Sequence, residues 1–421
     1  MLDGVNVALG VSGSIAAVKV VELAHELRRQ GAAVRGVMTD SARGIIHPWA
    51  VEFATGHEVV TELTGKVEHV ELCGREGWAD VLLLAPATAN TVGKIASAVD
   101  DTPVTTCATT ALGADLPVVV APAMHEPMYD HPGVLDAIDR VESWGVDFVD
   151  PRIEEGKAKI ATEEAIVTAV ARATTEQSLA GRHLVVTSGA TAESIDPVRI
   201  ITNRASGKTG RAVARACHVR GADVTLVHDG GDVPYAETVT VESAAEMNEA
   251  VLDAVSGDRD ATGGANGGGG RGAGESENGS DDGGRSEVDG APAADALVSA
   301  AAISDYTVET AAEKLRSGES RTLDLEPTPK LIDGVREAYP DLPIVGFKAE
   351  TSGEDEKMIE AARGILARSD LAFVVANDAS VMGDDETRTL FVDADDAVAF
   401  TGTKTELGAE IAERTATALR D

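Results

Sequence analysis

The loop at residues 10–16, which reads GVSGSIA, is the first segment whose residue types suggest chemistry. It follows a strand-like run at 5–9 and precedes a helical pattern. Small residues let an anion approach the backbone, and a helix N-terminus supplies free N–H groups and a positive dipole end. The spacing differs from the GxGxxG of a dinucleotide site, and Ser12 and Ser14 add hydroxyl groups. The loop predicts a site for a terminal phosphate monoester, although many α/β turns of this composition bind nothing.

Two further polar loops follow apolar runs. The run 81–85 (VLLLA) leads into PATAN at 86–90, and the run 116–121 (LPVVVA) leads into PAMHEPM at 122–128. Continuous apolar runs are typical of parallel strands covered on both faces, and ligands bind at the carboxyl ends of such strands. His69, in the sequence HVEL, lies shortly before the first of these runs. Taken alone, it is either a catalytic group or an ordinary surface histidine.

Five segments together resemble the homo-oligomeric flavin-containing cysteine decarboxylases, in particular phosphopantothenoylcysteine decarboxylase. They are GVSGSIAAVK, VMT (37–39), HVEL, GWADVLLLAPATANT and APAMHEPM, and they span most of residues 4–130. The resemblance implies that FMN oxidises a cysteinyl thiol, which lets the adjacent carboxylate leave as CO2, and then returns hydride to give 4'-phosphopantetheine. It also implies that His69 is the catalytic base. The residues implied to hold FMN are Ser12, Gly13, Ser14, Thr39, Pro86, Thr88 and Ala89.

The chain departs from this family at two positions. His125 stands where the bacterial family has an Asn that is expected to bind the substrate carboxylate, and a histidine could donate the same hydrogen bond with a dependence on pH. The bacterial flap also carries a proton-donating Cys, whereas the matching segment here, 151–160, has none. Lys157 or Lys159 replaces that Cys, or another group or water does, or the two lysines are only solvated flap charges.

A second group of polar segments begins after residue 181. The strand-like run 183–187 is followed by a long polar loop, which contains SGAT (188–191), DPVR (196–199) and NRASGKTG (203–210), and then by a helix. The quartet Ser-Gly-Lys-Thr is not a Walker A loop, because position 202 is Thr where that motif requires Gly. The segment is also far from its strand, so we reject a P-loop NTPase.

This second half closely resembles the phosphopantothenate–cysteine ligase domain. The resemblance rests on the loop above together with SAAAISDY (299–306), EKL (313–315), VGFKAET (345–351) and VAND (375–378). It implies that the carboxylate of 4'-phosphopantothenate attacks the α-phosphate of CTP to give an acyl-cytidylate and pyrophosphate. The amine of cysteine then displaces CMP.

The resemblance also implies roles for individual residues in the ligase half. Asp305 would contact the nucleotide or its Mg2+, Lys314 would neutralise phosphate charge, and Asn203 would stabilise the acyl-cytidylate. The alternative for Asp305 and Lys314 is a surface ion pair. The other expected nucleotide contacts are Ser299, Ala300, Ala301, Pro329, Lys330, Leu331, Ile332, Phe347 near the cytosine and Arg363, with Arg368 as a second basic candidate.

The elements that position these residues predict an α/β fold of two Rossmann-like, three-layer domains with parallel sheets, the first of them flavodoxin-like. Two separate β-α-β starts place the boundary near residue 178, which gives a decarboxylase domain at 1–178 and a ligase domain at 179–421. The Gly-rich stretch 256–291 has no apolar periodicity, so we expect a disordered insertion in the second domain. It is not a phosphate loop, because a helical pattern precedes it and a strand follows it.

The composition excludes several classes of partner. The chain of 421 residues has 71 acidic and 36 basic residues, a net charge of -35 that disfavours nucleic acid and anionic membrane surfaces. Acidity spread along the chain suggests a halophilic host, with a plain acidic surface as the alternative. Cys73, Cys107 and Cys217 form no CxxC pair, so no disulfide or zinc site is expected. Since neither a signal peptide nor a transmembrane stretch is apparent, a cytoplasmic protein is expected.

The sequence as a whole predicts a bifunctional enzyme of coenzyme A biosynthesis with small-molecule substrates. The resemblance implies a homo-oligomer in which flavin domains form trimers with FMN at their interfaces and ligase domains form dimers, which combine into a dodecamer. Two alternatives stay open. In one, the ligase is active and the flavin domain does not decarboxylate, or acts like a flavin prenyltransferase. In the other, the chain is a non-catalytic flavoprotein that regulates a partner.

Overall fold

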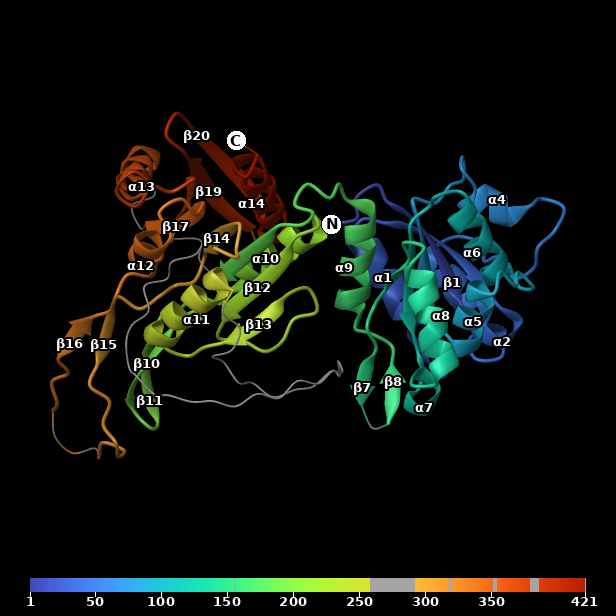
Figure 1. Cartoon of the computed structure of the whole chain (residues 1–421), viewed down its shortest axis with the longest axis horizontal. Coiled ribbons are helices and arrows are strands. Elements are labelled where there is room, and N and C mark those ends of the chain that lie inside the picture. The colour runs from blue at the N-terminus through green and yellow to red at the C-terminus, as the bar shows by residue number, and fades with distance from the viewer. Residues whose placement is uncertain are drawn as a thin grey trace, which may run out of the picture. The chain divides into compact units, whose positions relative to one another are not determined.

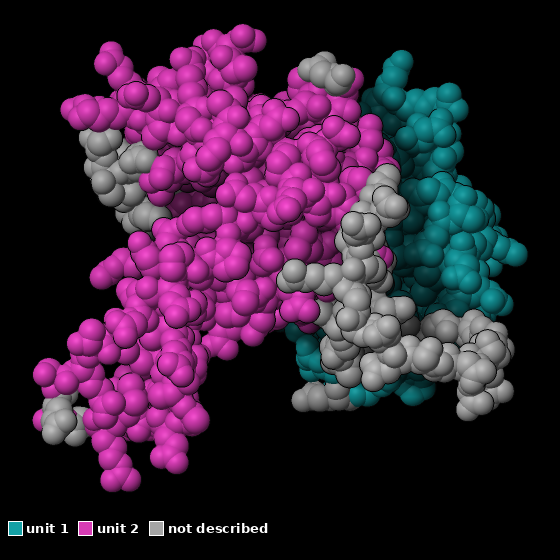
Figure 2. All heavy atoms as spheres, turned by 60° about the vertical axis from the view of Figure 1, so that its left-hand side comes forward, with its two compact units in different colours: residues 1–177 teal, residues 178–421 magenta. Residues whose placement is uncertain are grey.

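The computed structural model describes residues 1–154, 156–257, 292–316, 318, 320–350, 354–378 and 386–420. The chain consists of two compact units, Met1–Gln177 and Ser178–Asp421 (Figure 2). The insertion predicted at 256–291 lies outside the described residues from position 258 onward. None of the helices in these described ranges has the length and apolar character that crossing a bilayer requires.

Unit 1 contains a five-stranded parallel sheet in the order β2-β1-β3-β4-β6, which is the order of flavodoxin-like folds. β3 is buried along its whole length, as expected for a strand covered on both faces. The strands are β1 (Asn6–Val11), β2 (Ala33–Met38), β3 (Val81–Ala87), β4 (Val118–Pro122) and β6 (Asp147–Phe148).

Helices cover both faces of this sheet (Figure 1). Leu82 and Leu84 of β3 pack into a core with apolar side chains of α4, α5, α6 and α8, while α1 and α9 lie across the other face. The bounds are η1 (Ile15–Lys19), α1 (Val20–Arg29), α2 (Asp40–Arg43), α3 (Pro48–Thr55), α4 (Glu68–Cys73), α5 (Ala89–Ala96), α6 (Pro103–Gly113), α7 (Glu126–Tyr129), α8 (Pro132–Glu142) and α9 (Glu163–Thr174).

A small antiparallel sheet, in the order β5-β8-β7, follows β4. Its strands are β5 (Met124–His125), β7 (Arg152–Glu154) and β8 (Lys157–Lys159). The hairpin of β7 and β8 is the segment that the sequence predicts to be a flap, and it is visible at the bottom of Figure 1.

Unit 2 is built on an eight-stranded sheet in the order β13-β12-β9-β14-β17-β18-β19-β20. The strands from β13 to β18 are parallel, and β19 and β20 close the edge as an antiparallel hairpin. The strands are β9 (His183–Thr187), β12 (Asp223–His228), β13 (Glu237–Thr240), β14 (Ala296–Ser299), β17 (Ile344–Glu350), β18 (Phe373–Asp378), β19 (Glu386–Val392) and β20 (Ala397–Thr403).

Two helical layers enclose this sheet. Apolar side chains of α11, α12 and α13 form the core on one face, and those of α10 and α14 form the core on the other. The helices are α10 (Lys208–Val219), α11 (Ala244–Ser256), α12 (Leu331–Ala338), α13 (Asp355–Ser369) and α14 (Lys404–Ala418). The two units confirm the predicted α/β fold with parallel sheets. Cys73, Cys107 and Cys217 are buried and free.

The prediction of a long polar loop after β9 is wrong in part. It contains an antiparallel hairpin of β10 (Ala192–Asp196) and β11 (Arg199–Thr202), joined by a two-residue turn. A second antiparallel pair, β15 (Tyr306–Val308) and β16 (Leu325–Pro327), lies near it, and both extend away from the main sheet in Figure 1. Neither AESID nor RIIT alternates between polar and apolar residues, so the usual strand pattern is absent from this hairpin.

Candidate functional site

Ser12 connects the first loop of unit 1 to the loop after β3. Its hydroxyl donates to the carbonyl oxygen of Pro86 at 2.7 Å and accepts from the backbone N–H of Thr88 at 3.0 Å. Ser12 is only 2% exposed, so its hydroxyl hydrogen is committed to Pro86. Ser14 similarly donates to the carbonyl oxygen of Ala123 at 3.1 Å. These serines hold three loops of the site together at the carboxyl edge of the sheet.

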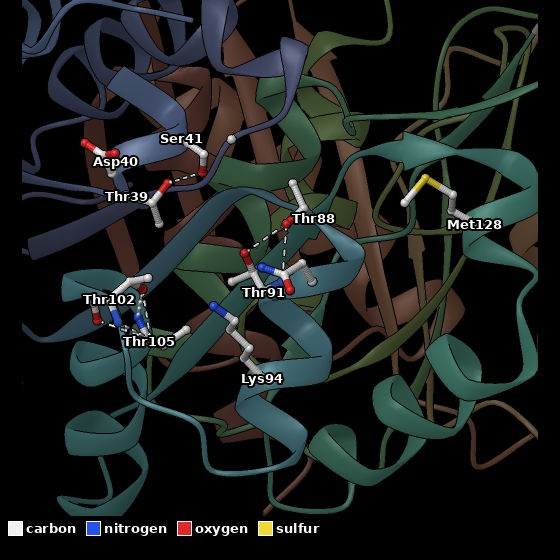
Figure 3. A pocket seen from close by; sticks show the side chains of 11 residues that line it. Thr39, Asp40, Ser41, Thr88, Thr91, Lys94, Thr102, Thr105 and Met128 are labelled. Carbon is white, nitrogen blue, oxygen red and sulfur yellow. Dashed lines mark hydrogen bonds between the residues drawn. The ribbon is translucent and has the colours of Figure 1, made fainter. Parts of the chain in front are cut away.

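A cavity of about 340 Å³ lies at this edge (Figure 3). Of the predicted flavin-binding residues, Gly13, Thr39 and Thr88 line it, whereas Ser12, Ser14, Pro86 and Ala89 are not among the lining residues. Thr39 and Thr88 accept hydrogen bonds from the first turns of α2 and α5, which fixes their side chains. The full lining is Gly13, Thr39, Asp40, Ser41, Thr88, Asn90, Thr91, Lys94, Thr102, Thr105 and Met128.

Lys94 also lines the cavity and was not predicted from the sequence. Of the lining residues that were not predicted, it has the clearest chemical role. It is the one basic side chain among the lining residues, and its ammonium lies 2.8 Å from both carboxylate oxygens of Asp101. Asn90 and Lys94 are four positions apart, so one face of α5 carries both, and that spacing was the available signal. Hydroxyls, an amide, a cation and the apolar Met128 together suit a ligand with a phosphate, a polar chain and an aromatic ring.

Because the resemblance implies that Gly13 helps to hold FMN, replacing it with alanine is expected to remove most of the flavin. A Cβ at this position would lie 2.4 Å from the Ser41 hydroxyl oxygen and 2.6 Å from the Ser41 Cβ, so the cavity wall must move. Overpacking of this kind lowers occupancy by about tenfold or more. The ratio of visible flavin absorbance to protein absorbance measures this occupancy. Gly93→Ala is the matched control, since an added Cβ there meets no atom within 4 Å. Full flavin content in Gly13→Ala would contradict the assignment of this cavity.

His69 lies on α4 and is not among the residues that line the cavity. Its Nδ1 is buried and has no hydrogen-bond partner in the part of the chain that the structure describes. The preceding Val67 adopts a left-handed conformation, with φ of 52°, at the start of this helix. Such a conformation is strained for a β-branched residue. Among the described residues, His69 therefore has an unsatisfied ring nitrogen and does not line the cavity of its own unit.

His125 and Lys157 are directly opposite each other in neighbouring strands. They form a register pair of β5 and β8, and both are exposed. Lys159, the other flap lysine, pairs with Glu154 at 2.9 Å. Of the two candidate flap cations, Lys157 is thus the one beside His125.

In unit 2, three side chains between the end of β9 and the residue after β11 bind the loop after β14. The Thr187 hydroxyl accepts from the Ala301 N–H at 3.1 Å, and the Thr191 hydroxyl accepts from the Ser304 N–H at 2.8 Å. The Asn203 amide donates to the Ala302 carbonyl oxygen at 2.8 Å. The structure therefore brings Asn203 to the predicted nucleotide-binding segment, whose first member, Ser299, ends β14.

Glycines allow the loop after β9 to lie against the N-terminus of α10. Gly189 and Gly207 have φ of +83° and +67°, and the Ser188 hydroxyl donates to the Gly207 carbonyl oxygen at 2.8 Å. A Cβ on Gly210 would lie 2.6 Å from the Cβ of Ser188. Gly207 is the N-cap of α10 and offers no side chain to cap the helix. This is the geometry of an anion site.

The remaining predicted ligase residues fall on three elements. Asp305 forms an ion pair with Lys330, and its carbonyl oxygen accepts from the Thr328 N–H at 3.0 Å, so the segment with Pro329, Leu331 and Ile332 adjoins it. Phe347 on β17 packs at the edge of a core cluster, and Arg363 is exposed on α13. No group of three or more His, Cys, Asp or Glu that could hold a metal occurs within the described ranges.

Lys314 is exposed on a segment without regular structure, and the contacts next to it were not foreseen. The Asp196 carboxylate accepts from the Leu315 N–H at 3.0 Å and pairs with Arg199. The Arg199 guanidinium holds the pKa of the Asp196 carboxyl well below its usual range. The DPVR motif is visible in the sequence, but no pattern there indicates a role for Asp196 or Arg199.

Two family models cover this chain: Flavoprotein at residues 1–175, and the DNA/pantothenate metabolism flavoprotein C-terminal domain at 179–262 and 285–419. A flavin cofactor and small-molecule substrates follow from these matches.

Proteins named coenzyme A biosynthesis bifunctional protein CoaBC are similar over nearly the whole length. The one from Thermococcus kodakarensis is 45% identical over 398 residues, which cover 94% of this chain and 90% of the relative. The one from Bacillus subtilis is 33% identical and covers 91% of this chain and 88% of the relative. A crystal structure of a CoaBC C-terminal domain, 25% identical with a TM-score of 0.43, covers 58% of this chain and 100% of that one. The chain belongs to the family of bifunctional coenzyme A biosynthesis proteins.

Proposed function

We propose that this chain joins cysteine to 4'-phosphopantothenate with CTP and then decarboxylates the product to 4'-phosphopantetheine. The observation that carries the proposal is the presence, in one chain, of both family models, each over its own compact unit. The alternative of a non-catalytic regulator is disfavoured, because Asn203 and the nucleotide-binding segment form a connected site that simple binding of flavin does not need.

The cavity of unit 1 is the proposed FMN site. FMN bound there would supply the two-electron oxidation of the cysteinyl thiol that makes loss of CO2 easy, and would take part in the later reduction. The Gly13 backbone and the hydroxyls of Thr39 and Ser41 suit the phosphate, with Lys94 as the nearby positive charge. Thr88 and Met128 line the remainder of the cavity.

The protein groups proposed to act on the substrate do not line the cavity of their own copy. His69 takes the thiol proton, His125 donates a hydrogen bond to the substrate carboxylate, and Lys157 returns a proton to the product. Because Lys157 is the register partner of His125, the flap would close these two groups over the same end of the substrate.

A homo-oligomer is proposed because His69 does not line the cavity of its own unit. A second copy would supply His69 to that cavity, as in the trimer that the resemblance implies. Exposed apolar side chains support such an interface, since Trp49 and Phe53 on α3 are 74% and 76% exposed. Val198 of the β10–β11 turn and Tyr306 of β15 are also exposed, which supports a second contact between ligase units. Trimers joined through dimers give the dodecamer expected above.

The ligase site is proposed at the carboxyl edge of the unit 2 sheet. The N-terminus of α10, which begins after Gly207, and the loop after β9 suit the phosphates of CTP. Lys314 would neutralise charge at the reacting phosphate, and Asn203 would bind the acyl-cytidylate. Asp305 would hold Mg2+ together with phosphate oxygens, because the described residues offer no complete metal site of their own. Further proposed nucleotide contacts are Ser299, Ala300, Ala301, Pro329, Lys330, Leu331, Ile332, Phe347 and Arg363.

The test supplies the purified chain with 4'-phosphopantothenate, cysteine, CTP and Mg2+ and follows the products by mass. Yellow protein that forms 4'-phosphopantetheine is the expected result. Accumulation of 4'-phosphopantothenoylcysteine would leave the ligase in place and favour the alternative in which the flavin unit does not decarboxylate. Failure to form the amide would refute the proposed function.

A further inference from the structure

The turn between β10 and β11 contains a carboxylate that water does not reach. Asp196 is 1% exposed, and its Oδ1 accepts from the N–H groups of Val198 at 2.9 Å and Arg199 at 3.0 Å. These two bonds shape the turn, as an aspartate at such a position commonly does. Its Oδ2 accepts from Arg199 Nη2 and, across 119 positions of sequence, from the Leu315 N–H at 3.0 Å.

The same ion pair holds both peptide groups of Leu315. Arg199 Nη2 also donates to the Leu315 carbonyl oxygen at 2.6 Å, so the carboxylate takes the N–H and the guanidinium takes the C=O. Two hydrogen bonds earlier in the chain align the segment before Lys314 with β10. The Thr310 hydroxyl donates to the Ser194 carbonyl oxygen at 2.8 Å, and the Ala311 N–H donates to the Ile195 carbonyl oxygen at 2.9 Å. Asp196 thus fixes the residue that directly follows Lys314.

The segment around Lys314 has little else to determine its path. It has no helix or strand between Val308 and Leu325 in the residues that are described there, and Lys314 itself is exposed. A flexible lysine loses side-chain and backbone freedom when it meets a phosphate, and anchoring its backbone beforehand lowers that cost. A buried carboxylate bound to a backbone N–H is a strong anchor, because charge-assisted hydrogen bonds are strong and the buried group has no water to replace a bond that breaks.

We propose that Asp196 is the positioning residue for Lys314: by holding the Leu315 peptide it sets where the Lys314 ammonium meets the nucleotide phosphates. The inference rests on the proposed ligase function. It assigns Asp196 no contact with substrate, so its effect must pass through Lys314.

A double-mutant cycle tests this dependence. Asp196→Asn keeps the shape but removes the charge, and it is expected to lower ligase kcat about tenfold or more while the KM for CTP changes about twofold or less. In the Lys314→Ala background the same change is expected to cost about twofold or less, because the lysine it positions is gone. Decarboxylation of supplied 4'-phosphopantothenoylcysteine reports on the intact flavin unit in every variant.

Asp295→Asn is the matched control in the same unit. Asp295 also binds an arginine and a backbone N–H, with Arg182 Nη1 at 2.6 Å and the His183 N–H at 2.8 Å, but it lies at the opposite, amino-terminal end of β9 and β14. We expect its ligase kcat to stay within about twofold of the unmodified chain. A loss equal to that of Asp196→Asn would overturn the inference.

Limited trypsin digestion gives a readout that does not depend on activity. Release of the Leu315 peptide should raise the initial rate of cleavage after Lys314 by about tenfold in Asp196→Asn, with no change in Asp295→Asn. Unchanged cleavage, or equal kcat losses for Asp196→Asn with and without Lys314, overturns the inference alone. An unmodified chain that forms no amide refutes the proposed function and this inference with it.

Discussion

Lys314→Ala is expected to lower ligase turnover by about 100- to 1,000-fold, the usual cost of removing one group that stabilises charge in a transition state. The exposed ammonium has no role in the core, so the protein should fold normally. Single-turnover formation of 4'-phosphopantothenoylcysteine, followed by mass, measures the loss. The flavin unit of the same sample should decarboxylate supplied 4'-phosphopantothenoylcysteine at the rate of the unmodified chain.

Lys357→Ala provides the control for this change. Lys357 is also an exposed lysine of unit 2, paired with Glu354 at 2.7 Å, and exposed pairs of this kind contribute little. Its ligase rate should remain within about twofold of the unmodified chain. If Lys314→Ala lowered the ligase rate no more than Lys357→Ala does, Lys314 would not be a catalytic residue.

His69→Asn is expected to abolish most decarboxylation, by about 100- to 10,000-fold, because proton transfer by a positioned side chain contributes on that scale. Flavin absorbance and amide formation should be retained, since His69 is proposed to act on the substrate thiol and not to hold the flavin, and it belongs to the other unit from the ligase residues. Release of CO2 from supplied 4'-phosphopantothenoylcysteine measures the effect.

His131→Asn is the control, because His131 caps α8 through its ring and asparagine is a good capping residue. A second experiment tests whether His69 acts in another copy. Co-expressed His69→Asn and Gly13→Ala chains should recover decarboxylation in mixed oligomers, because one chain supplies the flavin cavity and the other supplies the histidine. Absence of any recovery would place His69 and its flavin in the same copy.

The sequence predicted the parts of the fold that depend on long apolar runs. β3 and β9 appear where VLLLA and HLVVT are, because a fully buried parallel strand needs nearly every residue to be apolar. The hairpin of β10 and β11 was missed because its residues are mostly polar and half-exposed, and part of its stabilisation comes from the segment after β15. No local pattern reveals a partner that is more than a hundred residues away.

The candidate sites divide in the same way. The loops 10–16 and 86–90 were identified because each follows a predicted strand. The hydrogen bond from the Ser12 hydroxyl could not be predicted, because its partner Pro86 is 74 positions away. Lys94 was overlooked because a lysine on a helix is ordinarily a solvent-facing charge. Asp196 was noticed as part of a motif, yet its function depends on the Leu315 peptide, whose position only the folded chain shows.

The residues on either side of the stretch 258–291 are hydrogen-bonded to each other, which affects how easily the chain can change in length there. The Ala293 and Ala294 N–H groups donate to the Val255 carbonyl oxygen at 2.8 and 3.2 Å, so the last turn of α11 and the start of β14 are already joined without the residues between them. The junction precedes β14, away from the carboxyl edge, and the family model itself passes over residues 263–284. Each doubling of a loop costs only about 0.6 kcal/mol. Insertions and deletions between Val255 and Ala293 should therefore have little effect on stability. A fluorescent protein or an affinity tag can be inserted at the same junction.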